Sequence, residues 1–142
     1  MTADHDRGWL HMLDGVGTTI ALEAWDQKYK PNLDWNHAWG AVPANIIPHF
    51  LVGVRPLEPG FKKVLIKPQL GALQGIPATV PTIRGPVSVS VDQSKTFMLT
   101  VTIPGNTTAE GHLPSNLEHT DVLLGGKAVQ AVVVDQSVVI ES

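Results

Sequence analysis

Hydrophobic residues follow a helical spacing in the first part of the chain and an alternating spacing in the second. The first helical run predicts a helix that is ended by Gly15 and Gly17, because glycine commonly follows the last turn of a helix. The apolar residues of this helix are Trp9, Leu10, Met12 and Leu13. A short helical or extended segment is expected over residues 19–25. Pro31 then breaks the chain, because a proline disfavours helical backbone at the residue before it.

Residues 37–54 again show helical spacing, although two prolines interrupt them. Pro43 is compatible with the first turn of a helix, where a backbone N–H has no partner within the helix. Pro48 is expected to kink the helix or to remove one of its hydrogen bonds. The helix is expected to stop at Gly53.

Beyond residue 60, β-branched residues alternate with polar ones between Pro and Gly turns, which predicts strands. The expected strands are Lys62–Lys67, Thr79–Ile83, Val87–Val91, Thr96–Ile103, Thr108–Leu113, Asp121–Leu124, Lys127–Val134 and Ser137–Glu141. The run VSVSV at 87–91 predicts one buried and one solvated face. Gly125-Gly126 predicts a tight hairpin, and a second turn is expected at 135–137. About eight short strands predict an antiparallel β-sandwich.

The change in spacing places a domain boundary at about Glu58, giving helices over 1–57 and the β-sandwich over 58–142. The helices are too few to cover their own apolar faces, so the chain is expected to be a fragment whose helices pack against others. If the fragment folds alone, these faces predict self-association.

Composition excludes several classes of function. A net charge of −3 and a pI near 6.0, with scattered Lys and Arg, argue against nucleic acid as a partner. The chain has no Cys, so disulfides and thiolate chemistry are excluded. No apolar run approaches the roughly 20 residues that span a membrane, and the first residues lack the pattern of a signal peptide. The chain as given is therefore expected to be soluble without a membrane partner, and its compartment stays open.

Candidate chemistry lies between Thr18 and Gly53. This stretch contains Glu23, His37, the only Tyr and three of the four Trp residues. Sugars present C–H faces that stack on aromatic rings, and hydroxyls that need polar partners, so carboxylates among aromatics suit a sugar site. The alternative is that the Trp residues form a core and the carboxylates lie on solvated faces.

Four motifs in this stretch and just beyond it occur in one order and spacing: EAWD, NHAWGA, PANIIP and RPLEPGF. With them, the chain resembles the C-terminal end of bacterial α-L-rhamnosidases, family 78 of the glycoside hydrolases. The resemblance implies the last helices of an (α/α)6 toroid followed by a C-terminal β-sandwich. It also implies hydrolysis of terminal α-L-rhamnosyl residues with inversion, on a rhamnose-containing glycoside or oligosaccharide.

The resemblance assigns roles within the motifs. Glu23 matches the general base, although it could be an exposed glutamate at a helix end. His37 matches a histidine that contacts the substrate, although a half-buried histidine often makes only a structural hydrogen bond. Asp26 could orient a sugar hydroxyl or cap the segment after Trp25. Trp25 and Trp39 could line the pocket or belong to the core.

An inverting glycosidase needs a second carboxyl group as its general acid. The resemblance places that acid in an upstream segment of the toroid, outside this chain. Asp4, Asp6, Asp14 and Glu58 do not replace it, so the chain is expected to carry the base without the acid. Whether the isolated chain is an enzyme is left open, and a non-catalytic carbohydrate-binding or structural β-sandwich is the alternative function.

The sequence predicts neither a metal site nor a cofactor. Asp34, His37 and His49 do not have a recognised ligand spacing. The remaining candidates, His5, Asp6 and His11, lie near the N-terminus.

Overall fold

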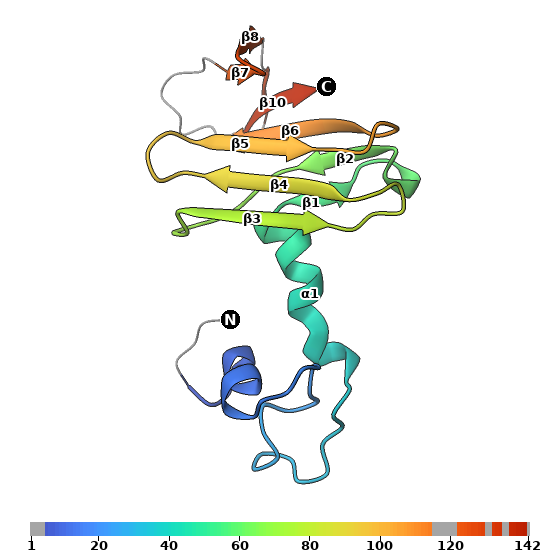
Figure 1. Ribbon diagram of the computed structural model, residues 1–142, viewed down its shortest axis with the longest axis vertical. Helices are drawn as coiled ribbons and strands as arrows, with labels where there is room; N and C mark the ends of the chain where they lie inside the picture. Colours follow the sequence, from blue (N-terminus) through green and yellow to red (C-terminus); the bar gives the residue numbers. More distant parts are fainter. Residues whose placement is uncertain (1–4, 115–121, 130–131, 135–136, 142) are drawn as a thin grey trace. The chain divides into compact units, whose positions relative to one another are not determined.

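The computed structural model describes residues 5–114, 122–129, 132–134 and 137–141. The chain forms two compact units, Met1–Ile46 and Ile47–Ser142. Figure 1 shows short helices and loops in the first unit and β-sheets in the second. The boundary between the two units falls after Ile46, whereas the change in composition along the sequence falls at about Glu58. The assignment of 1–57 to catalytic helices and of 58–142 to a separate domain stays a prediction.

The first unit has little regular structure. The helix predicted around Met12 is present as the π-helical turn η1 (His11–Gly15), whose last bond joins the Val16 N–H to the His11 carbonyl. Residues 19–25 form neither a helix nor a strand. Hydrogen bonds instead join this segment to 34–37, because Glu23 N donates to Asp34 O at 3.0 Å and His37 N to Ala21 O at 2.9 Å.

A small core holds this unit together. Met12, Leu22 and Leu33 are buried, and Trp9 and Trp25 pack against them. The two indoles meet edge to face, with ring centroids 4.9 Å apart and planes at 88°. The Trp9 Nε1–H donates to the Gly40 carbonyl at 2.8 Å, so its polar atom is satisfied inside the unit.

The predicted helix over 37–54 is divided into short elements. The 3-10 helix η2 (Ala38–Ala41) and the helix α1 (Val42–Ile46) belong to the first unit, and Pro43 lies in the first turn of α1 as expected. The α-helical pattern ends at Ile46, and the π-helical turn η3 (Ile47–Leu51) follows. Pro48 has no N–H to donate to the carbonyl four residues earlier, which explains the change.

The second unit contains two main sheets. A five-stranded sheet has the order β1-β2-β6-β10-β9, a three-stranded sheet has the order β3-β4-β5, and β7 pairs with β8. The strands are β1 (Val54–Pro56), β2 (Lys63–Ile66), β3 (Gly75–Val80), β4 (Val87–Asp92), β5 (Met98–Thr102), β6 (Thr108–Pro114), β7 (Val122–Leu124), β8 (Lys127–Val129), β9 (Val132–Val134) and β10 (Ser137–Glu141).

One hydrophobic core joins the two main sheets. Its buried members are Val52, Val54, Val64, Ile66, Leu70, Val80, Val87, Val89 and Val91. Apart from Val52 and Leu70, they come from β1 and β2 of one sheet and from β3 and β4 of the other, so the unit is a β-sandwich. The alternation predicted over 87–91 is confirmed, because the three valines of β4 are at most 2% exposed.

Several strand predictions were wrong in detail. The strand β1 lies where a helix end was expected, and β3 begins at Gly75 rather than Thr79. Pro77 within β3 hid this strand, although proline is tolerated there because β3 is an edge strand. The pairing of β2 with β6 is parallel, unlike the other pairings, so the sandwich is mostly antiparallel.

The Gly125-Gly126 hairpin is confirmed. It joins β7 to β8 with Leu124 opposite Lys127, and both glycines have positive φ, as a tight primed turn requires. The single strand expected over 127–134 is instead two strands, β8 and β9. Positions 135 and 136 of the expected turn lie outside the described residues.

Candidate functional site

The loops of the first unit bring Glu23 next to three residues from the segment after Pro31 and from the turn before it. The Glu23 Oε2 atom accepts the Asp34 N–H at 3.0 Å, and Oε1 forms an ion pair with the Lys30 ammonium. His37 Nε2 lies 4.0 Å from Oε1. The Glu23 side chain is only 13% exposed, so its carboxylate is held by these partners rather than by bulk water.

These contacts stabilise the ionised form of Glu23. The hydrogen bond from Lys30, and then that from the Asp34 N–H, lower the pKa of the Glu23 carboxyl below its ordinary value of 4.5. The group is therefore a carboxylate at neutral pH. A carboxylate can accept a proton from water, whereas a protonated acid cannot.

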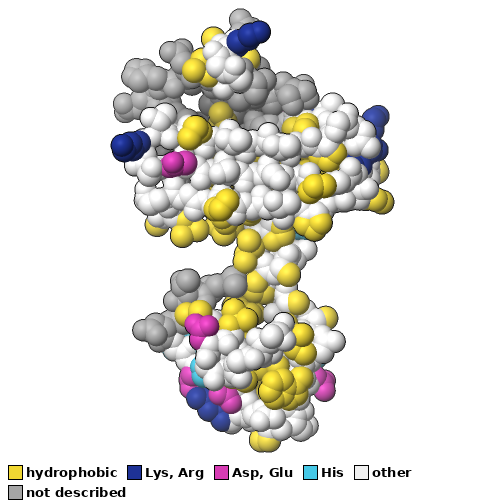
Figure 2. Space-filling model, viewed as in Figure 1, with side chains coloured by type: hydrophobic (Ala, Val, Ile, Leu, Met, Phe, Trp, Pro, Cys, Tyr) yellow, Lys and Arg dark blue, Asp and Glu magenta, His cyan; other side chains and the backbone are white. Residues whose placement is uncertain are grey.

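An exposed aromatic ring packs against the His37 imidazole. His37 and Trp39 pack with ring centroids 4.9 Å apart at 38°, and Trp39 is 64% exposed. The Nδ1 atom of His37 is buried and has no hydrogen-bond partner among the described residues. Figure 2 shows hydrophobic side chains on the visible surface of the first unit. Glu23, His37 and Trp39 thus combine a carboxylate, an imidazole and an exposed indole.

Two other predicted site residues have structural contacts. Asp26 binds His11 Nε2 through Oδ2 at 3.0 Å and caps the following turn by accepting the Lys28 N–H through Oδ1 at 3.1 Å. The hydrogen bond from His11, and then that from Lys28, lower the pKa of Asp26. Trp25 packs on Trp9 and the small core. These contacts match the capping and core alternatives, and the roles in substrate binding stay predictions.

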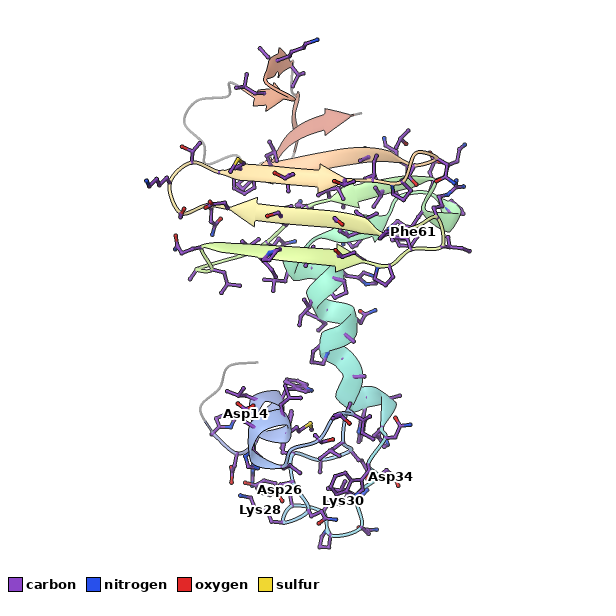
Figure 3. The ribbon with its side chains drawn as sticks, viewed as in Figure 1. Asp14, Asp26, Lys28, Lys30, Asp34 and Phe61 are labelled. Atoms are coloured by element: carbon purple, nitrogen blue, oxygen red, sulfur yellow. The ribbon has the colours of Figure 1, made fainter. Side chains whose placement is uncertain are left out.

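Lys30 and Asp34 were not predicted as site residues. Figure 3 shows both, with Asp26 and Lys28, on the loops of the first unit. The available signal was the Lys-Pro pair at 30–31, which predicts a turn that could fold the following segment back on Glu23.

Glu23, Asp34 and His37 could also hold a cation. One ligand atom from each lies within 4.8 Å of the other two. Carboxylate and imidazole are suitable ligands for several divalent metals. The Lys30 ammonium already neutralises Glu23, however, and would compete with a metal. His49, which was considered with Asp34 and His37, belongs to the second unit.

No helix among the described residues is long and apolar enough to cross a membrane.

The second unit is thus a β-sandwich domain, preceded in the chain by a unit that carries a cluster of a carboxylate and aromatic rings. Residues 53–126 match the model of the bacterial α-L-rhamnosidase C-terminal domain. The chain belongs to this family.

Two curated relatives are α-L-rhamnosidases. The protein of Streptomyces avermitilis is 32% identical over 123 residues, which cover 80% of this chain and 12% of that protein. The protein of an Alteromonas species is 31% identical over 112 residues, which cover 72% of this chain and 12% of that protein. The chain therefore spans about an eighth of the length of the curated relatives it matches.

Solved structures show the same fold. The α-L-rhamnosidase of Dictyoglumus thermophilum superposes with a TM-score of 0.76 at 23% identity, covering 92% of this chain and 16% of that chain. The Streptomyces avermitilis α-L-rhamnosidase in complex with L-rhamnose gives a TM-score of 0.66 at 27% identity, with 89% and 13% covered.

Proposed function

We propose that the chain is the C-terminal part of an inverting α-L-rhamnosidase and that Glu23 is the general base. The observation that carries the proposal is the position of the Glu23 carboxylate near the His37 imidazole, against which the exposed indole of Trp39 packs. An inverting glycosidase uses such a carboxylate to activate water on the face of the sugar opposite the leaving group. In this reaction Glu23 takes a proton from water as the water oxygen bonds to the anomeric carbon.

The ion pair with Lys30 has two effects on this role. It keeps Glu23 ionised in the free site, so the base is ready before substrate arrives. It also weakens the base, because a lowered pKa reduces the driving force for proton transfer. A bound sugar would remove water from the carboxylate, which raises its pKa again.

The general acid comes from outside this chain. Asp34 supplies a second carboxylate beside Glu23. An oxygen of one carboxylate lies within 4.8 Å of an oxygen of the other. The carboxyl groups of inverting enzymes are about 6.5–9.5 Å apart, to leave room for the water. Asp34 is therefore too close to serve as the acid, and an upstream segment of the catalytic domain supplies it.

Exposed apolar side chains support a missing upstream segment. In the first unit, the large hydrophobic residues that are at least 41% exposed are Leu10, Leu13, Ile20, Trp35, Trp39, Val42 and Ile46. Patches of this kind are normally covered by protein. We assign residues 1–57 to the last helices of an (α/α)6 catalytic domain, whose other helices cover these side chains. Self-association would cover them when the chain is isolated.

The substrate is a terminal α-L-rhamnosyl residue of a glycoside or oligosaccharide. The similarity to a Streptomyces avermitilis enzyme solved with L-rhamnose supports this choice. His37 would bind a sugar hydroxyl, and Trp39 would stack on the C–H face of the ring. Asp26 would orient a hydroxyl through a lone pair that its bonds to His11 and Lys28 leave free. Trp25 would border the site from the core side.

The test is hydrolysis of p-nitrophenyl α-L-rhamnoside. The chain alone is expected to give no turnover. It is then mixed with the Streptomyces avermitilis enzyme truncated before its matching C-terminal part. The mixture is expected to hydrolyse the substrate, Glu23→Gln to abolish turnover, and Asp14→Asn to leave it unchanged. Equal turnover with Glu23→Gln would exclude Glu23 as the base.

A further inference from the structure

A pocket of about 390 Å³ lies in the β-sandwich, among residues that the rhamnosidase site does not use. Its volume is within the roughly 300–1,000 Å³ of small-molecule sites. It is an open pocket formed by the loop after β2, the turn between β4 and β5, and the end of β6. The residues that line it are Lys67, Pro68, Gln69, Leu70, Gly71, Gln93, Phe97, His112, Leu113 and Pro114.

Hydrogen bonds hold two sides of this pocket in place. Gln93 Nε2 donates to the carbonyl oxygens of Gly71, at 3.0 Å, and Leu73, at 2.6 Å. The Lys67 N–H donates to the Gly53 carbonyl at 2.9 Å. The Gln93 amide oxygen and the Lys67 ammonium have no hydrogen bond or ion pair with the part of the chain that the structure describes. The Gln93 side chain is thus positioned, and its amide oxygen and the Lys67 ammonium are free to bind a ligand.

His112 contributes a third polar group with a defined tautomer. Its Nε2 lies 2.7 Å from Glu110 Oε1, and the other carboxylate oxygen of Glu110 lies 2.8 Å from the Lys63 ammonium. In the neutral imidazole, the hydrogen bond to Glu110 places the proton on Nε2. Nδ1 then has a lone pair that can accept a hydrogen bond from a ligand.

The lining therefore offers one hydrogen-bond donor, the Lys67 ammonium, and two acceptors, the Gln93 amide oxygen and His112 Nδ1. It also offers the apolar side chains of Phe97 and Leu70. No carboxylate is among the described residues that line it. Hydroxyl groups can donate and accept at once, so a polyhydroxylated ring satisfies all three polar groups. An anion without hydroxyl groups would be attracted to Lys67 but would have no hydrogen bond to donate to His112 Nδ1 or to the Gln93 amide oxygen. The C–H face of a sugar ring would pack on Phe97.

We propose that this pocket binds a neutral hexopyranose residue, separately from the site around Glu23. The β-sandwich would then hold a sugar of the glycan in addition to the residue that is hydrolysed. The proposal does not depend on the proposed catalytic role of Glu23.

The test is a titration of the ¹⁵N-labelled chain with L-rhamnose, D-glucose and D-galactose at millimolar concentrations, followed by amide NMR. At least one sugar is expected to give saturable shifts at Gly71, Gln93 and Phe97. Lys67→Met and His112→Ala are each expected to weaken binding about three- to tenfold, the effect of losing one hydrogen bond.

Two controls make the result specific. Lys62→Ala changes an exposed lysine outside the pocket and is expected to leave the affinity unchanged. Glu23→Gln is also expected to leave the affinity of the pocket unchanged.

The dispersion of the amide signals shows whether each variant is folded. If His112→Ala unfolds, the affinity of Lys67→Met alone tests the proposal. The absence of saturable shifts in the pocket with all three sugars would overturn the proposal, as would unchanged affinity in Lys67→Met. Shifts confined to residues 21–39 would support the site around Glu23 and refute this pocket.

Discussion

Gly53 is expected to be among the least replaceable residues of the β-sandwich. Its φ is +82°, a left-handed conformation that side chains rarely adopt. A Cβ atom at this position would lie 2.0 Å from the carbonyl oxygen of Lys67 and 2.5 Å from the nitrogen of Pro68. Both atoms are backbone, and the Gly53 carbonyl is itself bonded to the Lys67 N–H. Gly53→Ala must therefore displace backbone where the chain enters the sandwich.

Gly60 provides a matched control. It lies in the 3-10 turn η4 (Pro59–Phe61) with a φ of +64°, and a Cβ atom there would meet no described residue beyond its chain neighbours within 4 Å. The left-handed conformation costs a side chain roughly 1–2 kcal/mol, and this cost applies to both variants. Overpacking adds about 1–3 kcal/mol at Gly53 alone. The free energy of unfolding should fall by about 2–5 kcal/mol in Gly53→Ala and by about 1–2 kcal/mol in Gly60→Ala.

Urea unfolding followed by circular dichroism of the β-structure measures both losses. With a slope of roughly 1–3 kcal/mol per molar urea, the two midpoints should differ on the order of 1 M. The slopes should match that of the unchanged chain. Equal midpoints for the two variants would refute the steric argument, because the conformational cost alone would then explain both.

Three further predictions concern charge and turn geometry. Lys30→Met should raise the pKa of Glu23 toward its ordinary value of 4.5, as measured by carboxyl ¹³C NMR. Lys28→Met removes a partner of a different carboxylate, Asp6, and should leave the pKa of Glu23 unchanged. Equal changes in the pKa of Glu23 in the two variants would contradict the ion pair with Lys30. The lowered pKa of Glu110 contributes stability above pH 4.5 that is lost as pH falls through the lowered value. Glu110→Gln should therefore be less stable than the unchanged chain at pH 7, with a thermal-unfolding difference that shrinks in acid; a constant difference would refute this linkage. Gly125→Val should lower the stability of the hairpin by roughly 1–2 kcal/mol, because φ is +58° there, and unchanged hydrogen exchange in β7 and β8 would count against it.

Local sequence determined the features that depend on near neighbours. The alternation at 87–91 predicted the buried face of β4, because successive side chains of a strand point to opposite faces. The glycine pair at 125–126 predicted the hairpin, because glycine adopts the required positive φ without a steric cost. The four motifs between residues 23 and 61 predicted which family the chain resembles, and the family match and the curated relatives confirmed it.

Tertiary structure decided the features that depend on distant residues. The parallel pairing of β2 with β6 joins segments that lie more than 40 residues apart, and no local pattern encodes that choice. Pro77 could enter β3 only because that strand lies at a sheet edge. Likewise, Lys30 reaches Glu23 from the turn before Pro31, and Asp34 reaches it because the chain folds back after Pro31. The sequence by itself supplied a carboxylate and aromatic rings, and the fold decided which partners hold that carboxylate ionised, because hydrogen bonds and ion pairs act through space rather than along the chain.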